Sequence, residues 1–279
     1  MRRLGNPGAR LGERRPVRLL ASGRVLGGSI MKTAFVVLGM HRSGTSSVAG
    51  LLALLGATPP RTLMGPKPDN PKGFWESEVL MAFDDEILTR AGSAWDDPEP
   101  LDPRVFLGEQ GALLRRRARE KLVEEFGDAE TIVIKDPRIC RFYPFWRQAL
   151  ETAGYAPFAL IPVRDPAEVA ASLHQRNGMP PEQGLALWRR HVADAEAATR
   201  GQPRRIVFWR ELLEDWRRAL APVEAQLGRP LNLDDPARQA AIESFLSPGL
   251  SRHLGRAHPI PDAATIALYE RMRALAAET

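Results

Sequence analysis

Residues 36–47, VVLGMHRSGTSS, constrain the fold of this chain more than any other stretch. An apolar run leads to Gly39 and Gly44, and small hydroxyl residues then open an apolar helical pattern that stops at Gly56. This order predicts a strand, a tight turn and a helix. Backbone amides in such a turn, at the positive end of the helix dipole, bind anionic oxygens. The stretch therefore predicts a phosphate-binding loop.

The rest of the chain alternates short apolar runs with amphipathic stretches of helical length. Further runs rich in β-branched residues occur at 131–134, 158–163 and 205–208. Alternation of this kind is typical of a parallel sheet. We predict an α/β, three-layer fold like that of P-loop NTPases, with a central parallel sheet flanked by helices and a single domain over residues 31–279. Helical patterns lie at 45–56, 77–90, 106–126, 142–153, 182–199, 212–227 and 236–245.

Two segments next to the strands carry specific local signals. After the run at 158–163, Asp165 can cap a helix whose first position is Pro166, and Glu168 can complete a capping box. Residues 58–72 contain five prolines, which predicts a loop rather than a helix. Such a loop is in a position to cover a site.

The net charge of +5 comes from the first thirty residues. Of the 39 basic and 34 acidic side chains, seven and one lie in residues 1–30, which leaves 32 and 33 for the rest. We predict that residues 1–30 are a disordered basic leader, or that the true start is Met31. The near-neutral body predicts no nucleic-acid partner, and no run reaches the roughly 18 apolar residues of a membrane span. A single cysteine, Cys140, excludes an internal disulfide and suits the cytoplasm.

The glycine loop lacks the residue that ATP-binding loops need most. Gly39, Gly44 and Ser46 match the spacing G-x-x-x-x-G-K-[ST], but Thr45 stands at the lysine position. The amide cradle is kept, whereas the charge directed at ATP is lost. Arg42, three residues earlier, offers a cation that can straddle a bridging oxygen and a group in transfer.

These residues resemble the signatures of the sulfotransferase family. GMHRSGTSS is similar to the 5′-phosphosulfate loop, in which a strand, a Lys or Arg and S-G-T-[ST] precede a helix. VRDPAEVAASL resembles the second signature, where an Arg and a Ser eight positions later, here Arg164 and Ser172, hold the 3′-phosphate of PAPS (3′-phosphoadenosine 5′-phosphosulfate). IVFWRELLEDW at 206–216 and IKDPRICRF at 134–142 are weaker similarities, and in the former Trp209 and Arg210 replace the more usual Tyr-Glu pair.

The resemblance implies a PAPS-dependent, bacterial-type sulfotransferase that needs no metal. The acceptor would be a hydroxyl or amine of a carbohydrate, a lipid or a small molecule. Arg42 would stabilise charge on the bridging oxygen, and Arg252 or Arg256 would add a phosphate contact. The 5′-phosphate would be held by Ser43, Gly44, Thr45, Ser46 and Ser47.

The acceptor needs a general base, and three residues are candidates. Glu76 follows the loop-helix unit, where several members of the family place a glutamate, and we favour it. Asp136 ends a strand and so lies at the ligand edge of a parallel sheet, but it can equally pair with Arg138 or anchor the loop. His41 is expected to serve the loop's structure first.

Two other functions fit part of the sequence. The run TIVIKD, which ends at Asp136, is similar to the strand that holds Mg²⁺ in P-loop kinases and NTPases, so a kinase or NTPase that uses ATP and Mg²⁺ is an alternative. A non-catalytic nucleotide-binding protein is another.

Overall fold

A four-stranded parallel sheet forms the centre of the protein. The computed structural model describes residues 31–68, 70–246 and 262–279, so the leader and both Arg252 and Arg256 lie outside the described residues. The strand order is β2-β1-β3-β4. All three neighbouring pairs are parallel, which confirms the predicted sheet. The strands are β1 (Lys32–Val37), β2 (Thr131–Lys135), β3 (Tyr155–Val163) and β4 (Arg204–Phe208).

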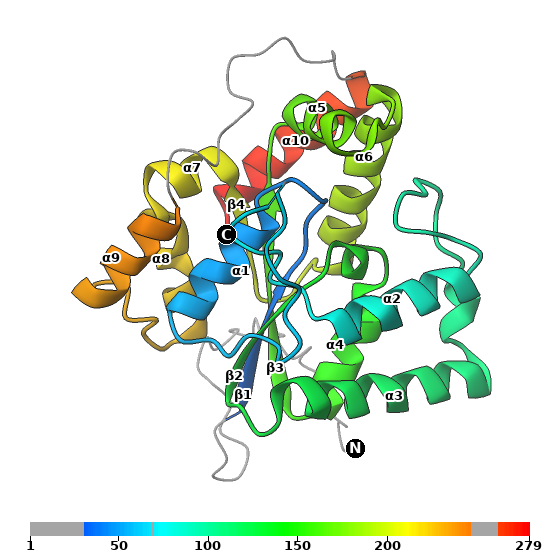
Figure 1. Cartoon of the computed structure of the whole chain (residues 1–279), viewed down its shortest axis with the longest axis horizontal. Coiled ribbons are helices and arrows are strands. Elements are labelled where there is room, and N and C mark those ends of the chain that lie inside the picture. The colour runs from blue at the N-terminus through cyan, green and yellow to red at the C-terminus, as the bar shows by residue number, and fades with distance from the viewer. Residues whose placement is uncertain (1–30, 69, 247–261) are drawn as a thin grey trace, which may run out of the picture.

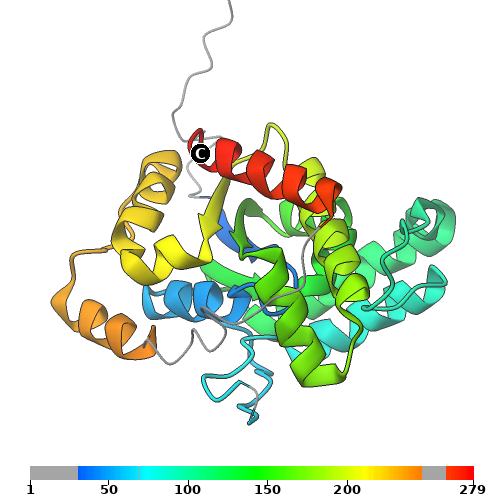
Figure 2. The same cartoon turned by 90° about the horizontal axis from the view of Figure 1, so that it is seen from above.

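Helices cover both faces of the sheet, as Figures 1 and 2 show. Side chains alternate across β1: Phe35 and Val37 pack into one apolar cluster, and Val36 packs into the other. The first cluster lies under α1 (Thr45–Leu54), α7 (Trp209–Glu214), α8 (Trp216–Leu227) and α9 (Pro236–Phe245). The second lies under α2 (Glu78–Arg90), α3 (Gly108–Phe126), α4 (Tyr143–Thr152), α5 (Pro166–Asn177), α6 (Pro181–Ala198) and α10 (Ala263–Ala276). The predicted three-layer α/β fold is confirmed.

The predicted helices agree with the structure except near the carboxyl end. The pattern at 212–227 is two helices, because the backbone of Asp215 is not helical (φ −154°, ψ 88°) and its side chain caps α8 by accepting from the amide of Arg218. Helix α10 was not predicted; its Met272 is fully buried in the core beside β4. None of the helices in the described part of the chain is long and apolar enough to cross a membrane.

The proline-rich loop is fixed to the body of the protein by one buried carboxylate. Glu125, near the end of α3, accepts hydrogen bonds from the amide and the hydroxyl of Thr62 at 3.1 and 2.8 Å. The hydroxyl of Ser77 lies 3.1 Å from that of Thr62 and also caps α2. The loop predicted at 58–72 is therefore present and anchored at its base.

A pair of buried acids lies beneath the sheet's carboxyl edge. Asp84 on α2 accepts a 2.8 Å hydrogen bond from the indole of Trp146, and its Oδ2 atom has no hydrogen-bond partner among the described residues. Burial raises the pKa of Asp84 well above its ordinary value, and the charge of the nearby Asp136 adds to this. Asp84 is therefore protonated in the folded protein at a pH where it is ionised in the unfolded chain.

We expect Asp84→Asn to remove a pH-dependent loss of stability. Above the ordinary pKa of 3.8, the unfolded wild type releases a proton that the folded state keeps, so the free energy of unfolding falls as the pH rises. The amide still accepts from Trp146 and does not titrate. The variant should gain about 1 kcal/mol or more over the wild type between pH 4 and pH 7. Urea unfolding at several pH values measures this, and a pH-independent difference would contradict it.

Candidate functional site

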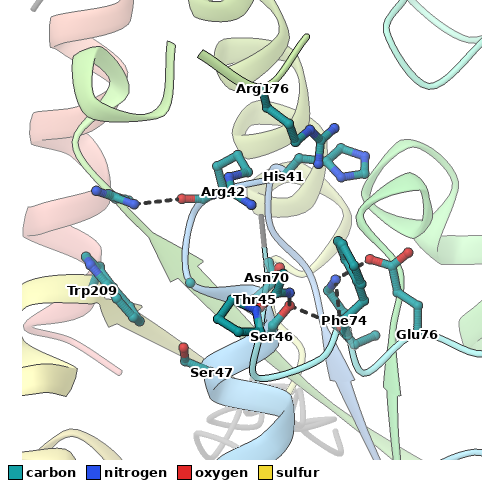
Figure 3. A pocket seen from close by; sticks show the side chains of 14 residues that line it. His41, Arg42, Thr45, Ser46, Ser47, Asn70, Phe74, Glu76, Arg176 and Trp209 are labelled. Carbon is teal, nitrogen blue, oxygen red and sulfur yellow. Dashed lines mark hydrogen bonds and ion pairs between the residues drawn. The ribbon is translucent and has the colours of Figure 1, made fainter. Parts of the chain in front are cut away.

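A cavity lies at the carboxyl edge of the sheet, where β1 runs into α1 (Figure 3). The residue before α1, Gly44, has φ +87°, and Arg42 has φ +68°, so the chain turns sharply between strand and helix. This turn aims the first amides of α1 toward the cavity. The loop contributes His41, Arg42, Gly44, Thr45, Ser46 and Ser47 to the lining, and other segments add Asn70, Pro71, Phe74, Glu76, Lys135, Arg164, Arg176 and Trp209.

Position 44 must be glycine for two reasons. Its φ value lies in the left-handed region, which side chains disfavour. A Cβ atom there would also lie 2.3 Å from the ring of Trp209, which is buried at the start of α7. The indole of Trp209 therefore packs closely against the glycine loop.

The hydroxyl groups of the loop have different surroundings. Ser46 donates to the carbonyl of Phe74 at 3.0 Å and accepts from the side-chain amide of Asn70 at 3.3 Å. These bonds connect the glycine loop to the proline-rich segment. Thr45 and Ser47 line the cavity and are largely buried. Ser43 is also buried, but its side chain is outside the cavity lining and its hydroxyl has no partner in the described ranges.

Arg42 and Arg164, which the sequence assigned to two ends of one ligand, line the same cavity. The Nε atom of Arg42 donates to the hydroxyl of Ser172 at 2.9 Å across 130 residues of sequence. Arg164 donates from Nη1 to the carbonyl oxygen of Arg42 at 3.2 Å. Its Nη2 atom is buried and has no hydrogen-bond partner among the described residues. Ser172 lies behind Arg42 rather than in the lining.

Glu76 and Lys135 form a buried ion pair in the cavity wall. The ammonium of Lys135 donates to Glu76 Oε1 and, at 3.1 Å, to the carbonyl of Phe74. The side chains of Glu76 and Lys135 are 5% and 3% exposed. A carboxylate from the segment before α2 and an ammonium from the end of β2 thus meet in the cavity wall.

Two solved structures resemble this architecture. A sulfotransferase domain of the olefin synthase of Synechococcus PCC 7002 matches with a TM-score of 0.53 and 17% identity, covering 86% of this chain and 94% of that one. A sulfotransferase domain of the curacin biosynthetic pathway matches with a TM-score of 0.50 and 12% identity, covering 88% and 98%. The chain has a sulfotransferase fold. No family model and no curated protein matches the sequence, and at these identities the similarity shows the fold alone.

Within this sulfotransferase fold, Asp136 follows β2 as predicted but is not among the residues that line the cavity. Its carboxylate accepts from the guanidinium of Arg138 at 2.9 Å and caps the short helix η2 (Pro137–Arg141), away from the described cavity lining. Burial raises the pKa of Asp136, Arg138 opposes that rise and the charge of Glu76 adds to it. Pairing with Arg138 was one of the two structural alternatives to a catalytic role, and the structure shows this pair.

His41 lines the cavity beside Trp95, with 5.1 Å between ring centroids. Burial lowers the pKa of His41, and the charges of Arg138 and Lys135 lower it further, so the imidazole is neutral near pH 7. Its Nε2 atom is buried and has no partner in the described chain. The imidazole is thus a neutral polar group in the wall of the cavity.

Sequence reasoning missed Arg176 and Asn70 as lining residues. Arg176 stands four positions after Ser172, one helical turn further along α5, so helical periodicity applied from Ser172 would have found it. Asn70 lies in the proline-rich segment and carries no comparable signal. Groups of three or more His, Cys, Asp or Glu side chains that could hold a metal ion are absent from the described residues.

We expect Gly44→Ala to be more destabilising than an ordinary substitution at a left-handed glycine. Gly228 ends α8 with φ +63° and has nothing within 4 Å of an added Cβ, so Gly228→Ala measures the backbone cost alone, about 1–2 kcal/mol. Gly44→Ala must also displace the ring of Trp209. Urea unfolding should show at least twice the loss for Gly44→Ala, and equal losses would show that Trp209 does not constrain the loop.

Proposed function

We propose that the protein transfers a sulfuryl group from PAPS to a hydroxyl or amine of a carbohydrate, lipid or small-molecule acceptor. The observation that carries this proposal is that Arg42, Arg164 and the turn that begins α1 meet at one cavity. The sulfotransferase fold supports it. The threonine at position 45 supports it as well, because the loop keeps its anion-binding backbone without the lysine that ATP chemistry requires.

The charge of the cavity suits the phosphosulfate end of the donor. Arg42, Lys135, Arg164 and Arg176 line it, against the single acid Glu76. The cavity has a volume of about 100 Å³ and is open to solvent on one side. We place the 5′-phosphosulfate at the backbone amides of the turn that begins α1, and the rest of the donor at the open rim. The buried, unpartnered Nη2 atom of Arg164 would then donate to the 3′-phosphate.

In the proposed step, the acceptor oxygen or nitrogen attacks the sulfur atom of PAPS. The bond from sulfur to the bridging oxygen breaks, and its electron pair remains on the phosphate of the leaving adenosine 3′,5′-bisphosphate. Arg42 stabilises that charge by donating to the oxygen as it becomes anionic. Glu76 takes the proton from the attacking group, and Lys135 holds Glu76 in place by donating to its Oε1 atom. Loss of one proton from acceptor to Glu76 balances the transfer.

The arrangement around Asp136 argues against a P-loop kinase or NTPase. In that chemistry Asp136 would hold Mg²⁺, directly or through water. The Nη1 atom of Arg138 lies 2.9 and 3.2 Å from the two carboxylate oxygens of Asp136, so this carboxylate is already paired with a guanidinium. Sulfuryl transfer moves a less highly charged group and relies on positioning and fixed positive charge.

The proposed donor predicts a specific order of nucleotide affinities. Adenosine 3′,5′-bisphosphate should bind at least tenfold more tightly than 5′-AMP or ADP, because the two latter nucleotides lack the phosphate that Arg164 recognises. Calorimetry with each nucleotide, and with ATP and Mg²⁺, measures the order. A preference for ATP with Mg²⁺ would favour the kinase. Tight binding of the bisphosphate without turnover of PAPS on any hydroxyl or amine acceptor would favour a non-catalytic binding protein.

We expect Arg42→Ala and Glu76→Gln to lower kcat far more than donor affinity. Removing one donor to a developing oxyanion costs about 10²–10³ in kcat, and removing a general base costs a comparable factor. Arg104→Ala is a suitable control, because Arg104 is exposed and pairs with Asp102 outside the cavity lining. Steady-state assays with labelled PAPS test the effect once an acceptor is found. Near-normal turnover by a folded Arg42→Ala variant would refute the role of Arg42.

A further inference from the structure

One buried carboxylate bridges two arginines, one of which, Arg164, lines the cavity. Glu168 accepts from Arg164 Nε through Oε2 at 2.8 Å and from Arg210 Nη2 through Oε1 at 2.7 Å. The side chain of Glu168 is 3% exposed, whereas that of Arg210 is 58% exposed. The three residues come from the end of β3, the first turn of α5 and the first turn of α7. Glu168, which the sequence placed in a capping box, thus forms an ion-pair bridge between α5 and α7.

The bridge separates two cavities. Arg164 and Trp209 line both the loop cavity and a second cavity of about 230 Å³, and Glu168 and Arg210 line the second. The guanidinium of Arg164 also lies over the ring of Trp209, 6.0 Å from its centroid. Arg164 is therefore held on three sides, by Glu168, by the carbonyl of Arg42 and by Trp209, with Nη2 as its unpartnered donor among the described residues.

We infer that Glu168 is a positioning residue that aims Arg164 at the donor's 3′-phosphate, and that Arg210 is a second phosphate-binding arginine of this subsite. The inference rests on the proposed function, because the 3′-phosphate belongs to PAPS. Its own observation is the shared carboxylate, which holds Arg164, in the wall of both cavities, and Arg210, in the wall of the second.

The charges of the bridge fit this role. The two guanidinium groups and one carboxylate of the bridge itself leave one net positive charge, while Arg273 and three more acids, Asp165, Glu211 and Glu214, also line the second cavity. The carboxylate prevents the repulsion that would otherwise separate the arginines. Although burial alone would raise the pKa of Glu168, the hydrogen bonds from Arg210 and Arg164 hold it below its ordinary value. Glu168 therefore stays ionised, and each arginine keeps donors to spare.

Positioning and simple electrostatics predict opposite effects of Glu168→Gln. The substitution removes a negative charge close to the phosphate, so charge alone predicts tighter binding of the bisphosphate. If the carboxylate positions Arg164, the variant loses the charge-assisted hydrogen bonds that orient the guanidinium, and the 3′-phosphate binds less well. The sign of the change separates the two explanations.

The experiment compares adenosine 3′,5′-bisphosphate with 5′-AMP by calorimetry. The dissociation constant of 5′-AMP divided by that of the bisphosphate gives a ratio that reports the contribution of the 3′-phosphate alone. We expect Glu168→Gln and Arg210→Ala each to reduce this ratio about tenfold to a hundredfold, the effect of losing a hydrogen bond to a charged group. Binding of 5′-AMP should change much less, and thermal unfolding shows whether each variant is folded.

The chain contains a matched control pair away from the site. Glu196 on α6 is 3% exposed and pairs with Arg200, which is 57% exposed, at 2.6 Å. Neither lines the two cavities. Glu196→Gln and Arg200→Ala should lower stability about as much as the bridge variants and leave the ratio unchanged.

The possible outcomes are distinct. An unchanged or increased ratio in a folded Glu168→Gln protein would overturn the positioning role, and an unchanged ratio in Arg210→Ala would overturn the second arginine. An equal reduction in the Glu196 control would show a general loss of stability instead. If the wild type itself does not prefer the bisphosphate to 5′-AMP, the proposed function fails, and the inference fails with it.

Discussion

The position of β1 between β2 and β3 determines what the rest of the structure can do. In a parallel sheet the carboxyl ends of neighbouring strands lie together, so the segment after a central strand is flanked by the segments after both neighbours. Arg42 follows β1, Lys135 ends β2 and Arg164 follows β3, and all three line one cavity. The cationic character of the cavity is therefore a consequence of strand order.

The sequence was sufficient for the features that depend on local chemistry or on parallel-sheet geometry. Gly44 and the hydroxyl residues after it specify a turn and a helix start, and Asp165 with Pro166 specifies another, which the structure has at α5. The convergence of Arg42 and Arg164 could be predicted because both follow strands of one parallel sheet. The same reasoning could not reveal that β4 and α7 bring Trp209 against Gly44, since that contact depends on packing between segments far apart in sequence.

Lys135 and Asp136 show that a position at the end of a strand does not decide which side chain faces the cavity. Both residues stand at the carboxyl end of β2, so strand position alone assigns either of them to the ligand side. Side chains alternate along an extended chain, and here Lys135 lines the cavity while Asp136 pairs with Arg138 and lies near Asp84 of α2. The register that decides between them is set by how β2 pairs with β1. The partnership of Lys135 with Glu76 is likewise a tertiary contact, across 59 residues.

The buried pair of Glu76 and Lys135 is better explained by chemistry than by stability. Removing two charges from water is costly, and a well-packed apolar pair of similar volume is often as stable as a buried ion pair. The fold has apolar side chains available at such positions, since Ile134 and Val133 precede Lys135 in the same strand. Under the proposed function, a carboxylate beside the glycine loop has a use that an apolar residue lacks: it can take a proton from an acceptor held next to the phosphosulfate. The same argument applies to Glu168, which is buried between Arg164 and Arg210 and which the inferred positioning role would explain.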